Sequence, residues 1–182
     1  MIPDLDGSHG QLPPGRYRAS RGELHDRFVD GRGAHRQQLW ADWESATSLL
    51  CRHVTVNAAW LYGQFVSDDP DPEILSCVYW AEDLELAKAR LNPSSATILA
   101  AFAQRGKVRR TVGLQVDTYL MAWHCQPDTS IEDRYLAPYL QRRGWVDDHL
   151  QRMRWGPRGS PPSREDALPR RGYVEVIVDD YQ

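Results

Sequence analysis

Apolar residues recur at spacings of three and four in several parts of the chain, as in helices that pack one face on a core. The strongest such stripe predicts a helix over residues 34–51. Ser20 and Glu23 have the spacing of a capping box, which predicts the start of a shorter helix that ends near residue 28. Further helices are expected over 82–91, from Ser94 or Ser95 to 104, and in two pieces over 131–153, where Pro138 and Gly144 interrupt the pattern.

β-branched and alternating segments lie between these helices and predict strands over 53–61, 75–80, 111–121 and 173–178. This order of elements predicts an α+β domain (mixed α/β), with helices flanking a mixed sheet. Residues 1–19 are rich in Gly and Pro and are expected to form an extended N-terminal arm on the surface. Residues 20–182 then form a single domain, in which 156–171, with four prolines, is an exposed loop.

The composition agrees with one folded domain, since 41% of the 182 residues are apolar and 26% are charged. The net charge of −3 argues against a general nucleic-acid binder. The chain has no apolar run of about 18 residues, so no membrane partner is expected. The first residues are neither basic nor apolar, so no signal peptide is expected. Three scattered cysteines without a CxxC motif predict reduced thiols and a cytoplasmic protein.

Other chemistry-bearing residues have simpler interpretations. The seven tryptophans are interpreted as bulky core residues rather than ligand-stacking surfaces. His124, Cys125, Asp128 and His149 lack the tight spacing of metal ligands and are interpreted as ordinary surface or buried groups. The basic clusters at 105–110, 142–143, 152–158 and 170–171 are interpreted as solvated and balanced by acidic loops. An acidic loop at 68–73 and the acidic residues 179–180 offer complementary charge to a basic partner surface.

The segment 62–79 carries the most specific signal, because the turn Gly63-Gln64-Phe65-Val66 follows a predicted strand and a Pro-Asp-Pro loop leads to the next. Further pieces occur in a consistent order: Leu12-Pro13-Pro14-Gly15, Arg36-Gln37-Gln38-Leu39-Trp40, Val116-Asp117-Thr118-Tyr119 and Arg170-Arg171-Gly172-Tyr173-Val174-Glu175. With these motifs the chain resembles small bacterial proteins of the nucleotidyltransferase superfamily. Their fold is related to the catalytic core of DNA polymerase beta and to the minimal nucleotidyltransferases of toxin–antitoxin systems.

The resemblance implies a Gly-Ser turn that binds phosphates and three carboxylates, two of them on alternate positions of one strand, that hold Mg²⁺. Here Gln64 replaces the serine, Ile74 and Ser76 replace the first two carboxylates, and Asp117 keeps the third. The resemblance therefore implies a degenerate active site, for which no cofactor is expected. Its remnant cleft comprises Gly63, Gln64, Glu73, Ser76 and Asp117.

The first hypothesis is a pseudoenzyme that binds a protein partner, with a nucleotide as the other possible ligand, and with Asp68, Asp69 and Asp71 at the partner-binding surface. The resemblance implies a setting in bacterial defence, as an antitoxin or an immunity protein. The alternative is an active transferase that uses Mg²⁺, a nucleoside triphosphate and a rearranged set of carboxylates, Asp117 with Glu73 or Asp71. A structural adaptor without a cleft function is the third hypothesis.

Overall fold

The computed structural model describes residues 1–128, 130–131, 133–154, 156–157 and 159–179. Predictions made for Trp155, Arg158 and Asp180 lie outside these residues. Five strands form one mixed sheet in the order β1-β5-β2-β3-β4. The strands are β1 (Gly15–Arg18), β2 (Ala58–Tyr62), β3 (Leu75–Glu82), β4 (Val116–Trp123) and β5 (Gly172–Ile177). β1 and β5 are parallel, as are β3 and β4, whereas β2 is antiparallel to both of its neighbours. The predicted α+β class is confirmed.

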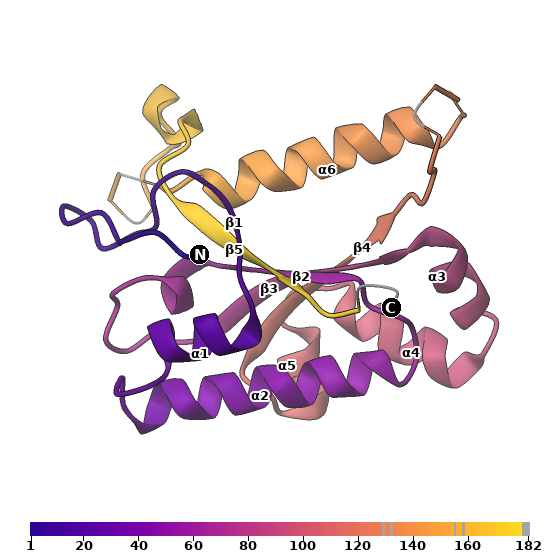
Figure 1. The fold of residues 1–182 in the computed structure, drawn as a ribbon, viewed down its shortest axis with the longest axis horizontal. Helices are drawn as coiled ribbons and strands as arrows, with labels where there is room; N and C mark the ends of the chain where they lie inside the picture. The colour runs from indigo at the N-terminus through magenta and orange to yellow at the C-terminus, as the bar shows by residue number, and fades with distance from the viewer. Residues whose placement is uncertain (129, 132, 155, 158, 180–182) are drawn as a thin grey trace.

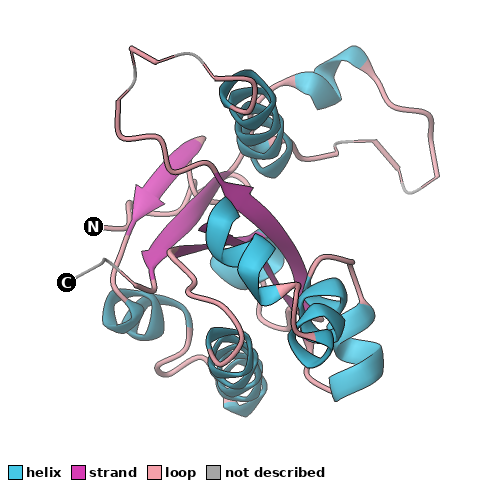
Figure 2. Ribbon diagram, turned by 90° about the vertical axis from the view of Figure 1, so that its right-hand side faces the viewer, coloured by secondary structure: helices cyan, strands magenta, loops and turns pink. Residues whose placement is uncertain are grey.

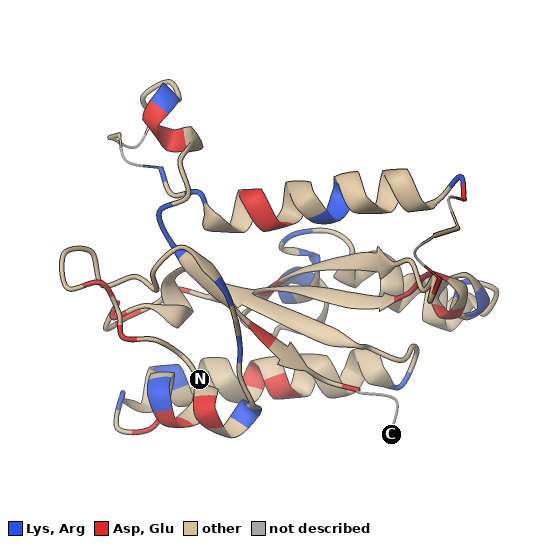
Figure 3. Cartoon of the chain, turned by 45° about the horizontal axis from the view of Figure 1, so that its top comes forward, with Lys and Arg blue, Asp and Glu red and all other residues tan. Residues whose placement is uncertain are grey.

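Helices cover both faces of this sheet. They are α1 (Arg21–Phe28), α2 (Ala34–Cys51), α3 (Asp83–Ala89), α4 (Pro93–Phe102), α5 (Lys107–Val112) and α6 (Leu136–Gln151). Helix α6 lies on one side of the strands, and α1 and α2 lie on the other (Figures 1 and 2). Basic and acidic residues are interspersed along the ribbon (Figure 3). None of the helices in the described ranges is both long and apolar enough to cross a membrane.

Each face of the sheet has its own buried cluster. The larger one joins the sheet to α1, α2, α4 and α5 through residues such as Trp43, Tyr79 and Phe102. The smaller one joins Trp60 and Trp80 to Val146 and Leu150 of α6. The expectation that tryptophans fill the core is therefore confirmed for Trp43, Trp60 and Trp80. It is wrong for Trp145, which is 57% exposed.

Four sequence expectations differ from the structure. Residues 111 and 112, which were expected to begin a strand, end helix α5 (Lys107–Val112), because Gly106 and Gly113 adopt left-handed conformations at the two ends of the helix. Asn92, not Ser94 or Ser95, caps α4. The strand expected over 53–61 begins only at Ala58. Helix α6 is one continuous helix, because Pro138 falls in its first turn, where backbone N–H groups have no intrahelical partner.

The N-terminal arm is extended, as expected, but it is part of the domain. Gly15–Arg18 form the edge strand β1, and Leu12 is buried. The Gly172 N–H donates to the carbonyl oxygen of Leu12 at 2.7 Å, which anchors the arm to the start of β5. At this point the chains are so close that a Cβ atom on Gly172 would lie 2.3 Å from the carbonyl oxygen of Pro13. The arm therefore requires glycine at this position.

Candidate functional site

The turn after β2 has a fixed backbone. Gly63 has a φ of +81° and opens a short 3₁₀ helix, Gly63–Val66. The Ser67 hydroxyl donates to the carbonyl oxygen of Gln64 at 2.7 Å and accepts from the Asp69 N–H at 3.2 Å. The side chain of Gln64 is exposed. The turn thus presents its second residue to solvent, at the place where the resemblance expects the phosphate-binding serine.

The side chain of Arg36, in α2, fixes the backbone of this turn through hydrogen bonds. Its buried guanidinium donates to four carbonyl oxygens at 2.5 to 3.0 Å, those of Phe28, Phe65, Ser67 and Asp69. It also lies over the Phe65 ring, 5.4 Å from its centroid. Burial lowers the pKa of Arg36. The sequence carried a signal for this role, because Arg36 falls on the apolar stripe of the predicted helix, three residues before Leu39.

Tyr62, Ser76 and Asp117 lie side by side on three neighbouring strands, because Tyr62 pairs with Ser76 and Ser76 pairs with Asp117. Alternation along the strands directs these residues to the side of the sheet that α6 covers. The Asp117 side chain is 9% exposed, and its Oδ2 accepts from Nε of Arg105 at 3.0 Å. Its buried Oδ1 has no partner among the described residues.

The negative charge of Asp117, which lies beside Tyr62 and Ser76, is compensated within the protein by Arg105. The hydrogen bond from Arg105 to Asp117 raises the pKa of Arg105, so the guanidinium stays charged. Burial raises the pKa of Tyr62 to about 12, so its hydroxyl stays protonated at neutral pH. Asp117 is therefore the acidic member of a compact Tyr–Ser–Asp–Arg group.

The other predicted carboxylates have different neighbours. Glu73 is exposed and lies 3.9 Å from Arg109, and Asp71 lies 3.7 Å from Nε2 of His35. Asp69 Oδ1 accepts from the Asp71 N–H at 3.0 Å, and the Asp68 N–H donates to Gly10 at 2.9 Å. In the part of the chain that is described, no three His, Cys, Asp or Glu residues form a group that could hold a metal ion. The residues present do not fit the three-carboxylate site that the resemblance implies.

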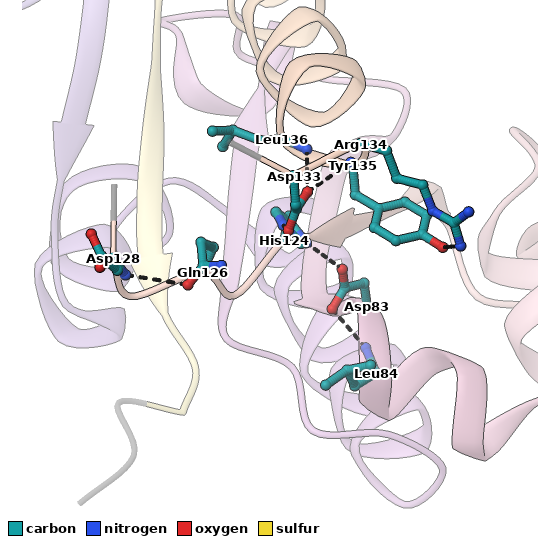
Figure 4. A network of polar contacts seen from close by, with 9 residues as sticks. All are labelled: Asp83, Leu84, His124, Gln126, Asp128, Asp133, Arg134, Tyr135 and Leu136. Carbon is teal, nitrogen blue, oxygen red and sulfur yellow. Dashed lines mark hydrogen bonds and ion pairs between the residues drawn. The ribbon is translucent and has the colours of Figure 1, made fainter. Parts of the chain in front are cut away.

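A second polar group lies at the far end of β4 (Figure 4). His124 Nδ1 is 2.7 Å from Oδ2 of Asp83, and its Nε2 is 2.9 Å from Oδ2 of Asp133. Asp133 Oδ1 also accepts from the N–H groups of Tyr135 and Leu136. His124 therefore links the end of β4 to the first residue of α3 and to the segment just before α6. Sequence reasoning gave it no such role, because its partners come from segments far apart in the chain.

The neighbouring candidates do not join His124. Cys125 is exposed, and Asp128 accepts from the N–H of Ser130 at 2.9 Å. His149 lies on α6, where its ring stacks on that of Trp145 with centroids 5.2 Å apart. The structure thus places these three residues apart from the His124, Asp83 and Asp133 group.

We expect His124 to make stability depend on pH. The hydrogen bonds to Asp83 and then Asp133 raise its pKa above the ordinary value near 6.5. The contribution of His124 to the free energy of unfolding is therefore complete below pH 6.5. It is lost as pH rises through the raised pKa of His124. Urea unfolding at a series of pH values should show this loss in the wild type and not in His124→Gln. The same pH dependence in both proteins would contradict the assignment.

Comparison with known proteins identifies the family to which the chain belongs. A search of curated proteins and a search of solved structures each gave no match. A family model matches residues 3–177, which include all five strands and all six helices described above. The chain therefore belongs to DUF6932, a family of unknown function.

Proposed function

We propose that this protein is a binding protein on a nucleotidyltransferase-like scaffold and that it has lost nucleotidyl transfer. The supporting observation is the environment of Asp117. Its cross-strand neighbour is Ser76, and the cation beside it is the guanidinium of Arg105. A transferase of the kind that the sequence resembles has further carboxylates and Mg²⁺ here.

The pairing with Arg105 disfavours a metal for a simple electrostatic reason. A divalent cation at the unpaired Oδ1 of Asp117 would lie close to the guanidinium that donates to Oδ2 at 3.0 Å, and one that used both oxygens would displace this charge-assisted hydrogen bond. Ser76 adds one neutral oxygen, whereas Mg²⁺ sites in proteins use one or two carboxylates together with substrate phosphates. The balance of charge therefore favours the existing ion pair.

Partner binding is assigned to the acidic loop that contains Asp68, Asp69 and Asp71. Asp68 and Asp71 are exposed, while the loop backbone is fixed through Arg36 and Ser67. A preordered acidic loop suits a basic protein surface, because little conformational freedom is lost on binding. The resemblance supports a role in bacterial defence, as an antitoxin or immunity protein that meets its toxin through this loop.

The loss of transfer is tested with labelled nucleoside triphosphates in Mg²⁺ or Mn²⁺. We expect no labelling of the protein, of added RNA or of added protein acceptors, and an identical result for Asp117→Asn. Labelling that disappears in Asp117→Asn would overturn the proposal. Its further loss in Glu73→Gln or Asp71→Asn would establish the rearranged carboxylate set instead.

The loop assignment is tested by co-purification from the native host with wild type and with the double variant Asp68→Asn, Asp71→Asn. The variant keeps the size of both side chains and removes two exposed charges. A specific partner that the wild type retains and the variant loses supports the assignment. A partner that both proteins retain equally contradicts it.

A further inference from the structure

The two halves of α6 are attached to the rest of the protein in different ways. In the second half, Val146 and Leu150 are buried against the sheet, and the hydroxyl of Tyr173 in β5 donates to Asp147. The first half comprises residues 136–143, all of which the structure describes, and none of them is fully buried. The position of the first half therefore depends on a few polar and aromatic contacts.

One of these contacts is made through His124, at the end of β4 (Figure 4). Asp133, which precedes α6, lies with its Oδ2 2.9 Å from Nε2 of His124. Its Oδ1 accepts from the N–H groups of Tyr135 and Leu136 at 2.7 and 2.9 Å, so this carboxylate also caps the start of the helix. On the other side of the ring, Nδ1 lies 2.7 Å from Asp83, the first residue of α3.

Both contacts of His124 require a protonated ring. A carboxylate only accepts hydrogen bonds, so each ring nitrogen has to donate one, and only the imidazolium has two N–H groups. A neutral ring would direct the lone pair of its other nitrogen at a carboxylate. We expect the remaining N–H to stay on Nδ1, because the contact to Asp83 is the shorter one and contributes most to the raised pKa of His124. Loss of the proton therefore breaks the contact to Asp133.

We propose that His124 is a proton-operated latch on the first half of α6. The protonated ring binds Asp133 and keeps the first half of the helix against the sheet. Loss of the proton releases the first half, while the second half stays bound to the sheet. Arg143 moves with the first half, and its guanidinium lies 5.4 Å from the ring centroid of Trp60 and 5.6 Å from that of Trp80. It lines a cavity of about 370 Å³ together with both tryptophans, so opening exposes aromatic surface.

Several other titratable groups lie around His124. They come from α3, from the end of β3, from the next residue in the chain, and from α6 with the segment before it: Asp83, Glu82, Cys125, Asp133, Tyr135 and Tyr139. Backbone hydrogen bonding lowers the pKa of Asp133, and burial raises the pKa of the Cys125 thiol. Burial also lowers the pKa of His149, the histidine of α6. Near neutral pH, Asp133 is therefore charged, the thiol protonated and His149 neutral, whereas His124 loses its proton as pH rises.

The test is hydrogen exchange of the full chain at a series of pH values, measured by mass spectrometry and corrected for the intrinsic effect of pH. Amides in the first half of α6 should exchange through a local opening that low concentrations of urea do not promote. Its equilibrium constant should rise by up to about tenfold per pH unit between pH 6.5 and the raised pKa of His124, and then level off. Amides of α2, which packs in the larger buried cluster, should be better protected at every pH.

Two variants remove the latch. Asp133→Asn keeps an acceptor for the backbone N–H groups but loses the charge that binds the imidazolium, and its amide can donate to a neutral ring, so the rise of opening with pH should disappear. His124→Gln cannot donate to both carboxylates and should open equally at every pH. His149→Gln is the matched control and should retain the rise seen in the wild type.

Three results would overturn the proposal. The first is an opening of the first half of α6 that does not change with pH in the wild type. The second is a rise with pH that persists in Asp133→Asn or in His124→Gln. The third is equal protection of the first half of α6 and of α2, because the helix would then open only when the whole domain unfolds.

Discussion

Replacing Arg36 with methionine is expected to lower the free energy of unfolding by about 4 kcal/mol or more. Methionine keeps much of the side-chain volume but removes the donors to all four carbonyl oxygens. Each charge-assisted hydrogen bond contributes about 1.5–3 kcal/mol, and water entering the loop recovers only part of the total. Since small domains have about 5–15 kcal/mol of stability, the variant should be close to unfolding. Urea denaturation followed by tryptophan fluorescence measures the change.

Two other variants separate charge from geometry. Arg36→Lys retains the positive charge but cannot reach four carbonyls with a planar fork, so an intermediate loss is expected. Arg32→Ala removes an exposed arginine close in sequence and should change stability by less than about 0.5 kcal/mol. A loss below about 1 kcal/mol in Arg36→Met would mean that the turn and the acidic loop do not depend on this residue.

The second large effect is expected for Gly172→Ala, at about 3 kcal/mol of destabilisation. The added Cβ would lie 2.3 Å from the Pro13 carbonyl oxygen and 3.0 Å from that of Gly15, and both atoms belong to the backbone. Tyr17 limits the space further, with Cε2 at 2.6 Å. Relief requires the arm to move away from β5, which would break the parallel pairing of β1 and β5.

Hydrogen exchange of the arm, together with urea denaturation, checks this prediction. Amides of β1 should exchange faster in Gly172→Ala, and the free energy of unfolding should fall. Gly144→Ala is the matched control, because a Cβ there meets no atom within 4 Å and the residue is inside α6. It should stabilise the protein by up to about 1 kcal/mol. Equal stability of the two variants would contradict the steric argument.

Local chemistry in the sequence was sufficient for much of the fold. The capping box of Ser20 and Glu23 at α1 and the apolar stripe of α2 each depend on residues that are close together in the sequence. The structure contains both. Helix α5 was missed because valines and a threonine imitate a strand, while the flanking glycines determine the conformation. Strand β1 was missed because its partner lies more than 150 residues away in the sequence. No local pattern reports a pairing of that kind.

The same distinction between local sequence patterns and long-range contacts applies to the candidate site. The resemblance implied a remnant cleft of Gly63, Gln64, Glu73, Ser76 and Asp117, because these residues belong to or stand beside short motifs. The register that sets Ser76 beside Asp117, and the approach of Arg105 from the segment between α4 and α5, depend on tertiary packing.

The position of β5 has a consequence for synthesis on the ribosome. β5 is the last of the five described strands in sequence, yet it lies between β1 and β2, which are the first two. Until residue 177 has been made, β1 has no strand to pair with, and β2 exposes an open edge. A nascent chain that already contains every described helix therefore still carries the unpaired β1 and the open edge of β2, which other chains can capture. A chain that ends before β5 therefore leaves the middle of the sheet incomplete and is prone to aggregation.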